Sequence, residues 1–194
     1  MNFLYERLSD TAHHEGFPNP ERLREQRSLK QVIVRGVKRF NEDPKKGIVF
    51  LAQQGIIDGV DNADSIAKFL KGTSRVNKKL LGEYISKKQN IDILKAFMAI
   101  FDFAGKRVDE ALREVLETFR LPGESQLIER IVNEFSEKYC EAAENLKDVA
   151  DKDAVFVLSY AIIMLNTDQH NPGVKVNFFF HRRLTVQLTT SRPA

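Results

Sequence analysis

The acidic residue Glu124 follows a Pro-Gly pair and precedes a segment with helical periodicity. Proline and glycine at positions 122 and 123 interrupt a helix, so the glutamate is predicted to lie in the first turn of the helix that follows. A carboxylate there stabilises the helix by a few tenths to about 1 kcal/mol, because it opposes the helix dipole. From residue chemistry alone, this structural role is the simplest interpretation of Glu124.

A second polar segment, residues 166–172, reads Asn-Thr-Asp-Gln-His-Asn-Pro. It follows an apolar run, and Pro172 prevents a helix from continuing, so the segment is predicted to be a polar helix end and turn. Its Asp168 and His170 alone do not make an established zinc pattern. The same holds for the remaining histidines, which are His13, His14 and His181.

Other catalytic chemistry finds little support in the chain. No glycine-rich phosphate-binding loop with its Gly-Lys-Ser/Thr ending occurs. Cys140 is the only cysteine, and it ends an amphipathic segment without a nearby histidine. A buried or half-buried thiol is therefore favoured over a nucleophile, and a single cysteine also points to a reducing compartment such as the cytosol.

The segments that must position these residues are helical. Apolar residues recur at spacings of three and four from Ser28 to Phe40 and in five shorter segments between Ile66 and Tyr139. Pro44 suits the first position of a second helix, and Gly55 suits its end. Residues 154–165 are apolar on nearly every side, which predicts a central helix packed all round. The fold class predicted is all-α, built from stacked helix pairs.

The charge pattern argues against a nucleic-acid-binding protein. The chain has 194 residues and a net charge of +3. Four basic residues follow the last acidic residue, Asp168, which leaves a net charge of −1 for residues 1–174. The lysine pairs at 78–79 and 87–88 could contact phosphate or lipid head groups, but a solvated helix face is the simpler interpretation.

Composition divides the chain into three parts. Residues 1–27 are predicted to be a polar lead-in, residues 28–175 the folded domain, and residues 176–194 a basic tail of different character. The N-terminus has no sustained apolar run, and residues 154–165 are too few to span a bilayer. Neither export nor membrane insertion is therefore expected.

Two motifs together resemble a known family. Residues 119–124, Phe-Arg-Leu-Pro-Gly-Glu, resemble the first motif of the Sec-seven domain of Arf guanine-nucleotide exchange factors, and residues 163–172 resemble the second. Residues 40–48 are similar to the family's opening helices, and the likeness covers about residues 29–175. Two long motifs in the family's order are more specific than either alone. Residues 90–92 and 109–113 are most similar to the large Golgi-type, brefeldin-related members.

The resemblance implies a right-handed superhelix whose hydrophobic groove binds the switch regions of an Arf-family small GTPase. By motif position Glu124 is the catalytic acidic residue, which enters the partner's nucleotide site and promotes GDP release in vesicle trafficking. The reaction involves no covalent chemistry, so the chain is not expected to be an enzyme in that sense. It is also expected to hold no cofactor or metal of its own, because GDP, GTP and Mg²⁺ belong to the GTPase.

Further roles follow from motif position. Phe156, Ile163 and Met164 are expected to contact the GTPase, with Asn171 at the polar end of the groove; the alternative for each is ordinary packing. Phe156 stands where relatives often have tyrosine, so a hydroxyl contact there would be absent. The family links three further positions to the brefeldin A response, and they are Tyr160, Ala161 and Asp168.

The resemblance stops in the tail. The family continues with helices that complete the domain, whereas residues 176–194 match none of them, and the hypothesis is that a splice, a frameshift or a gene-model ending replaces those C-terminal helices. Part of the apolar surface at residues 154–165 would then be exposed. The alternative function is a GTPase-binding or helical interaction fragment without exchange activity. The expected location is cytoplasmic, with peripheral recruitment of the parent protein to Golgi membranes.

Overall fold

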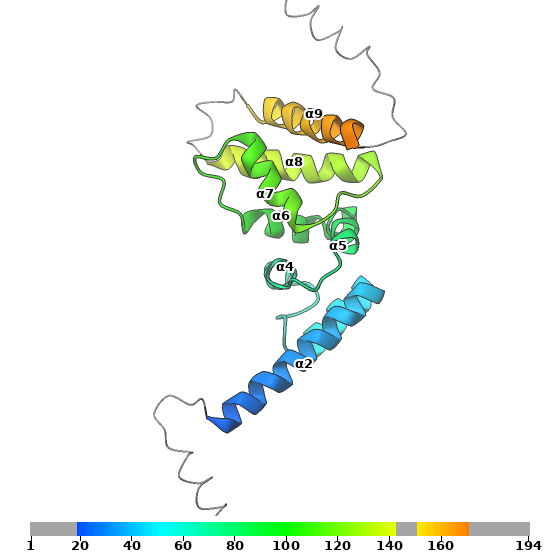
Figure 1. The fold of residues 1–194 in the computed structure, drawn as a ribbon, viewed down its shortest axis with the longest axis vertical. Coiled ribbons are helices and arrows are strands. Elements are labelled where there is room, and N and C mark those ends of the chain that lie inside the picture. The colour runs from blue at the N-terminus through cyan, green and yellow to red at the C-terminus, as the bar shows by residue number, and fades with distance from the viewer. Residues whose placement is uncertain (1–18, 143–150, 171–194) are drawn as a thin grey trace, which may run out of the picture.

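The computed structural model describes residues 19–142 and 151–170, and within these ranges it contains helices and connecting loops but no strand. The predicted all-helical class is therefore confirmed. The helices are stacked from α2 at one end of an elongated molecule to α9 at the other (Figure 1). They are α2 (Pro20–Glu42), α3 (Pro44–Gln53), α4 (Ala63–Gly72), α5 (Lys78–Ile85), the 3-10 helix η2 (Lys88–Asn90), α6 (Ile91–Ala99), α7 (Val108–Thr118), α8 (Ser125–Glu141) and α9 (Lys152–His170).

The boundary between α2 and α3 lies at Asp43, as the Asp-Pro pair predicts. Its backbone is extended, at φ −148° and ψ 107°, and its carboxylate accepts hydrogen bonds from the backbone N–H groups of Lys45 and Lys46 at 3.0 and 3.4 Å. Pro44 occupies the first position of α3, where a missing N–H is tolerated. Gly55 follows the end of α3 with a positive φ of 65°, a conformation that favours glycine.

Helix α2 begins earlier than its apolar stripe indicates. Asn19 caps it, since its side chain accepts the backbone N–H of Glu21 at 2.9 Å, and Pro20 follows at the first position. The expected start at Ser28 is therefore wrong by eight residues. The reason is that residues 20–27 are mostly exposed and polar, so local capping rather than burial determines where the helix starts.

A chain of aromatic side chains links the stacked helices. Phe40 on α2 meets Tyr84 on α5 edge-on, with ring centroids 5.5 Å apart, and Phe97 on α6 meets Phe119 beyond α7 at 6.1 Å. At the α2–α3 hairpin the backbones nearly touch, because a Cβ at Gly47 would lie 2.4 Å from the Cα of Phe40. Large buried rings of this kind hold the layers together through apolar area and edge-to-face contacts.

Helix α9 packs against α8 and α7 on one side only. Val155 and Ile163 are buried, but Val157 is 65% exposed and Leu165 is 62% exposed. Among the described residues no element covers its outer face, so the expectation of a helix packed all round is not met there, whereas part of its apolar surface is exposed as expected. The predicted loss of C-terminal helices and the character of residues 176–194 concern segments outside the described residues.

None of the helices in the described ranges is long and apolar enough to cross a membrane.

Candidate functional site

The segment between α7 and α8 forms a sharp joint. Phe119 follows α7 in an extended conformation, and its ring is buried against Phe97 at an interplanar angle of 70°. Pro122 is also buried, whereas Gly123 and Glu124 are exposed. The joint is therefore fixed in the core at its start and reaches solvent at the glutamate.

Glu124 is the N-cap residue of α8 rather than a member of its first turn. Its backbone carbonyl accepts the N–H groups of Leu127 and Ile128 at 3.1 and 3.2 Å, but its side chain makes no capping hydrogen bond. Among the described residues the carboxylate has no hydrogen-bond or ion-pair partner. The expected position inside the first turn is thus corrected, and the carboxylate is left accessible to a molecule from outside.

Helix α5 holds this joint from the side. The backbone carbonyl of Lys78 accepts the N–H of Arg120 at 2.9 Å. The ammonium group of the same lysine donates to the carbonyl of Glu117, in the last turn of α7, at 2.6 Å. One residue at the start of α5 therefore fastens both the end of α7 and the beginning of the loop that carries Glu124.

Gly82, one turn further along α5, allows the loop to lie this close. A Cβ atom at position 82 would stand 1.9 Å from the carbonyl oxygen of Arg120, a backbone atom that cannot move aside without moving the joint. Sequence reasoning missed Lys78 and Gly82 as positioning residues. The available signal was an isolated glycine inside a helical pattern, which often marks a close backbone approach.

The two sequence motifs meet at the same end of the molecule. Helices α8 and α9 run antiparallel, so the start of α8 lies beside the last turns of α9 (Figure 1). A groove of about 430 Å³ lies between the two motifs. Leu121 of the first motif and Ile163 of the second both line it. Its remaining lining residues are Asp109, Leu112, Arg113, Leu116 and Glu117 of α7 and Ile162, Asn166 and Thr167 of α9.

The predicted contact residues of α9 border different hollows. Ile163 is 3% exposed and lines the groove, whereas Phe156 borders a separate, shallow hollow beside α8. The ring of Phe156 stacks on Tyr160, with centroids 6.0 Å apart and planes at 14°. Met164 is half-buried one helical turn beyond Tyr160. Only Ile163 of the predicted set therefore lines the groove that holds both motifs.

The other predicted positions are less fully described. Tyr160 is half-buried and Ala161 is exposed, while the side chain of Asp168 and all of Asn171 lie outside the described residues. Their roles in drug response and GTPase contact stay predictions.

The apolar groove residues of α7 were missed at the sequence level. Leu112 and Leu116 belong to a helical stripe that core packing explains equally well, so periodicity could not separate the groove wall from the core. Leu112 is 2% exposed, whereas Leu116 is half-buried, which places only the latter at the groove surface.

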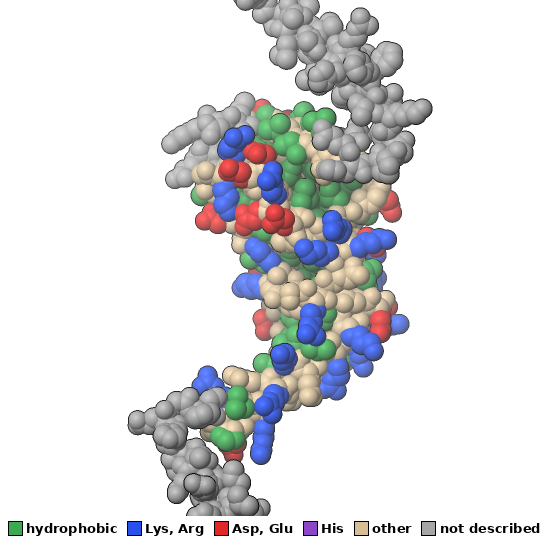
Figure 2. Space-filling view, in the orientation of Figure 1, with side chains coloured by type: hydrophobic (Ala, Val, Ile, Leu, Met, Phe, Trp, Pro, Cys, Tyr) green, Lys and Arg blue, Asp and Glu red, His purple; other side chains and the backbone are tan. Residues whose placement is uncertain are grey.

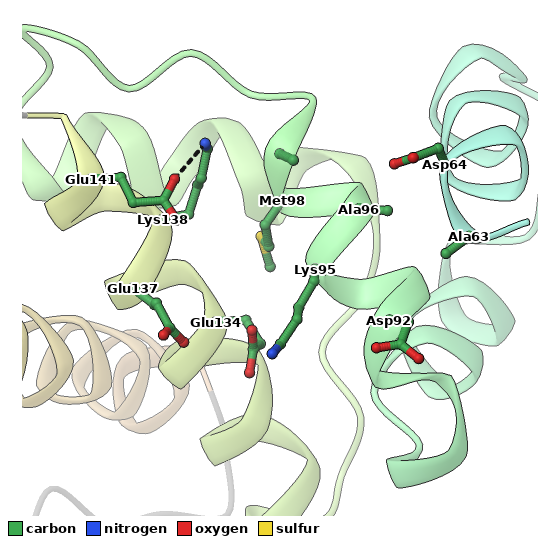
Figure 3. Close-up of a pocket in the computed structure, with 11 residues that line it drawn as sticks. Ala63, Asp64, Asp92, Lys95, Ala96, Met98, Glu134, Glu137, Lys138 and Glu141 are labelled. Atoms are coloured by element: carbon green, nitrogen blue, oxygen red, sulfur yellow. Dashed lines mark hydrogen bonds and ion pairs between the residues drawn. The ribbon is translucent and has the colours of Figure 1, made fainter.

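Another cavity, of about 420 Å³, lies between α4, α6 and α8, away from Glu124 (Figure 3). Five of its eleven lining residues are acidic and two are lysines. Glu134 and Lys95 point toward one another, and Lys138 pairs with Glu141 at 2.7 Å. Within residues 19–142 and 151–170, no group of three or more His, Cys, Asp or Glu side chains is arranged to hold a metal ion.

Comparison with known proteins agrees with this architecture. The family model for the Sec7 domain matches residues 29–187. The chain is 43% identical over 176 residues to ARF guanine-nucleotide exchange factor 2 of Saccharomyces cerevisiae, covering 84% of this chain and 12% of that protein. It is 41% identical over 155 residues to Brefeldin A-inhibited guanine nucleotide-exchange protein 3 of Arabidopsis thaliana, covering 79% and 9%.

A solved structure titled "Structure of ARF1-GDP bound to Sec7 domain complexed with Brefeldin A" superimposes with a TM-score of 0.72 at 49% identity, covering 78% of this chain and 76% of that one. The all-helical domain of this chain, with its exposed glutamate at a helix joint beside a partly apolar groove, is therefore of the Sec7 type. The chain belongs to the Sec7 domain family, and the large Golgi-type Arf exchange factors are its homologues. It spans about a tenth of the length of these curated relatives.

The match to the Sec7 family model extends twelve residues beyond position 175, which is where the resemblance seen in the motifs ends. The proposed domain boundary stays a prediction, since those residues lie outside the described part of the chain.

Proposed function

We propose that this chain is the catalytic unit of a guanine-nucleotide exchange factor that promotes GDP release from an Arf-family small GTPase. Its homologues are named as exchange factors for ARF or as brefeldin A-inhibited exchange proteins. The observation that carries the proposal is the accessible carboxylate of Glu124 on a joint that α5 fastens beside the groove. The reaction makes and breaks no covalent bond, and the nucleotide and Mg²⁺ are bound by the GTPase.

Glu124 acts by charge. Its carboxylate enters the nucleotide site, opposes the β-phosphate of GDP, competes for the region of Mg²⁺ and pairs with the GTPase's phosphate-binding lysine. An exposed carboxylate without a partner of its own loses no internal ion pair when it does so. A carboxylate that capped α8 would first have to break that hydrogen bond, and Glu124 makes none.

One carboxylate does not supply the whole effect. A 10⁴-fold acceleration corresponds to a barrier lower by about 5 to 6 kcal/mol. Two like charges about 4 Å apart repel by about 4 kcal/mol at an effective dielectric constant near 20, before screening and imperfect geometry reduce the value. Groove contacts must supply the rest by binding the GTPase best in the conformation that expels nucleotide.

The groove suits such a contact. Leu116, Leu121 and Ile162 are half-buried and offer apolar surface, while Asn166 and Thr167 are exposed at its polar end. Phe156 provides a second apolar contact at the hollow beside α8, and Met164 adds half-buried apolar surface further along α9. In the cell the proposed unit works in vesicle trafficking, within a parent protein recruited peripherally to Golgi membranes.

A nucleotide-release assay tests the proposal. An Arf GTPase loaded with fluorescent GDP is mixed with the chain in the absence of membranes, and release is compared for the wild type and Glu124→Lys. The wild type is expected to accelerate release, and the charge reversal to abolish the acceleration, because a lysine attracts the phosphate that the glutamate repels. Pull-down of the GTPase should persist, since the groove is unchanged.

The matched control is Glu25→Lys, which changes the charge by the same amount at an exposed position in the first part of α2, at the opposite end of the molecule from α8 (Figure 1). It should leave release unaffected. If the wild-type chain binds the GTPase but does not accelerate release, the non-catalytic binding fragment is the correct function and the proposal is wrong.

A further inference from the structure

The charges of the molecule are divided between its two ends. Residues 19–90 hold 16 Lys and Arg against 8 Asp and Glu, a net charge of +8. The described residues from 91 onward, 91–142 and 151–170, hold 8 basic against 14 acidic side chains, a net charge of −6. Figure 2 shows Lys and Arg side chains spread over the α2 to α5 end of this face, with acidic side chains gathered toward the α7 to α9 end. The small total charge therefore conceals a strong asymmetry.

Part of the positive charge forms a regular stripe on α2. Arg24, Arg27, Arg35 and Lys38 follow one another at spacings of three, eight and three, with Gln31 between the two pairs. These spacings place them on one face of the helix, and no acidic residue shares that face between Arg24 and Lys38. At 1.5 Å per residue the stripe is about 21 Å long.

This face points away from the rest of the protein. Gly36, Val37 and Phe40 are buried on the opposite side, where α3 packs. All four basic residues of the stripe are exposed, and none of them forms an ion pair with a described residue. The only hydrogen bond from the stripe stays within α2, from Arg35 Nε to the carbonyl of Gln31 at 3.4 Å. The stripe is therefore free to meet an external negative surface.

We propose that this outward face of α2 is a contact surface for an anionic membrane. The negative potential of a bilayer rich in acidic lipids attracts a row of Lys and Arg side chains within about 8 Å, one Debye length at physiological salt. The charge asymmetry orients the molecule in that field, with α2 toward the membrane and the acidic α7 to α9 end, where the groove lies, away from it. Glu124 thus stays accessible to a GTPase while the chain is bound.

The exposed apolar residues favour lipid over nucleic acid as the partner. Single-stranded RNA is bound by basic grooves that also present aromatic rings for base stacking. In the described part of the chain every aromatic ring is at least half-buried, and the large exposed apolar side chains are aliphatic. Val34, which is 37% exposed, lies beside the stripe. Aliphatic side chains among cations suit the lipid interface.

Vesicle sedimentation with the full chain tests this surface without any GTPase, so it can fail independently of the exchange proposal. Vesicles of phosphatidylcholine alone are compared with vesicles that contain about 30 mol % phosphatidylserine. We expect binding to the anionic vesicles only. Arg27→Glu/Lys38→Glu should weaken that binding by at least about tenfold, since two attractive charges become repulsive.

Two further variants guard against misinterpretation. Arg27→Lys retains the charge and should retain binding, while Lys68→Glu/Arg75→Glu makes the same change in net charge at exposed positions outside α2 and should alter binding by less than about twofold. Circular dichroism of each variant verifies folding, which is expected to persist because the substituted residues are exposed. Equal loss in the two double variants, or equal binding to neutral vesicles, overturns the proposal. In a separate competition, polyuridylic acid is added to the chain bound to anionic vesicles. The proposal is also overturned if this RNA displaces the chain by binding it more tightly than the lipid does.

Discussion

The two regions that carry the family motifs are built differently. The joint before α8 is held from the side by α5, through the contacts of Lys78 and Gly82 with residues 117–120. Helix α9 is held on one side only, with Val155 and Ile163 buried and Val157 and Leu165 exposed. Glu124 thus stands on a joint that two residues of α5 support, while no described element covers the outer face of the helix that completes the groove.

This difference shows how the proposed activity depends on distant packing. A charge that acts on a phosphate at about 4 Å loses much of its effect if it moves by 1 or 2 Å, because the interaction falls with distance. A groove formed partly by apolar contacts tolerates more adjustment. The joint is therefore the place where small structural changes should reduce exchange most.

The largest effect is expected from Gly82→Ala. The new methyl group would collide with the carbonyl of Arg120, so we expect the free energy of unfolding to fall by about 2 to 3 kcal/mol and nucleotide release to slow while GTPase pull-down persists. Urea denaturation and the release assay measure the two effects. Gly72→Ala is the matched control, because a Cβ there meets nothing within 4 Å. Equal stability of the two variants would sink the claim that α5 supports the joint.

A pair of valines tests the two sides of α9. Val155 is fully buried and Val157 is 65% exposed, two residues away on the same helix. Val155→Ala should lower the free energy of unfolding by about 2 kcal/mol, through lost burial and the cavity left behind. Val157→Ala should change it by less than about 0.5 kcal/mol, since alanine is also the better helix former. A large loss at Val157, measured by urea denaturation, would mean that its face is covered in solution.

A smaller effect is expected from Lys78→Met, which keeps the backbone carbonyl but removes the hydrogen bond to Glu117. Loss of this bond at an exposed position should cost about 0.5 to 1 kcal/mol of unfolding free energy. Lys79→Met is the matched control, since its exposed side chain makes no hydrogen bond to a described residue. If thermal unfolding of the two variants coincides, the side-chain fastening of α7 contributes nothing measurable.

The smallest effect is expected in the reactivity of the Cys140 thiol on α8. This reactivity measures how tightly the start of α9 packs against α8. Burial, and secondarily the negative charge of Asp151, raise the pKa of the Cys140 thiol. A raised pKa means less thiolate at a given pH, so alkylation by iodoacetamide should be slower than for a free cysteine and should keep accelerating as the pH rises above about 8.5. Alkylation as fast as that of an unstructured cysteine peptide would show that this end of α9 is loosely packed.

Much of the local structure could be predicted because it depends on neighbouring residues. The Asp43-Pro44 boundary and the end of α3 at Gly55 follow from capping and from the conformations of proline and glycine. The start of α2 could not be read from burial, because residues 20–27 have little apolar periodicity and Asn19 supplies the cap. Likewise, the apolar run at residues 154–165 indicated a helix correctly but could not say how many of its sides are covered.

The sequence by itself determined the all-helical class, the breaks at Asp43-Pro44, Gly55 and Pro122-Gly123 and, through two motifs in order, the family. These depend on short-range propensities and on residue identity, which are present in the linear chain. The tertiary structure alone decided that Glu124 makes no capping hydrogen bond, that Gly82 meets Arg120, which face of α9 no described element covers, and that the basic and acidic parts of the sequence lie at opposite ends of the described molecule. Each of these depends on which distant residues become neighbours, and that is fixed only when the helices pack.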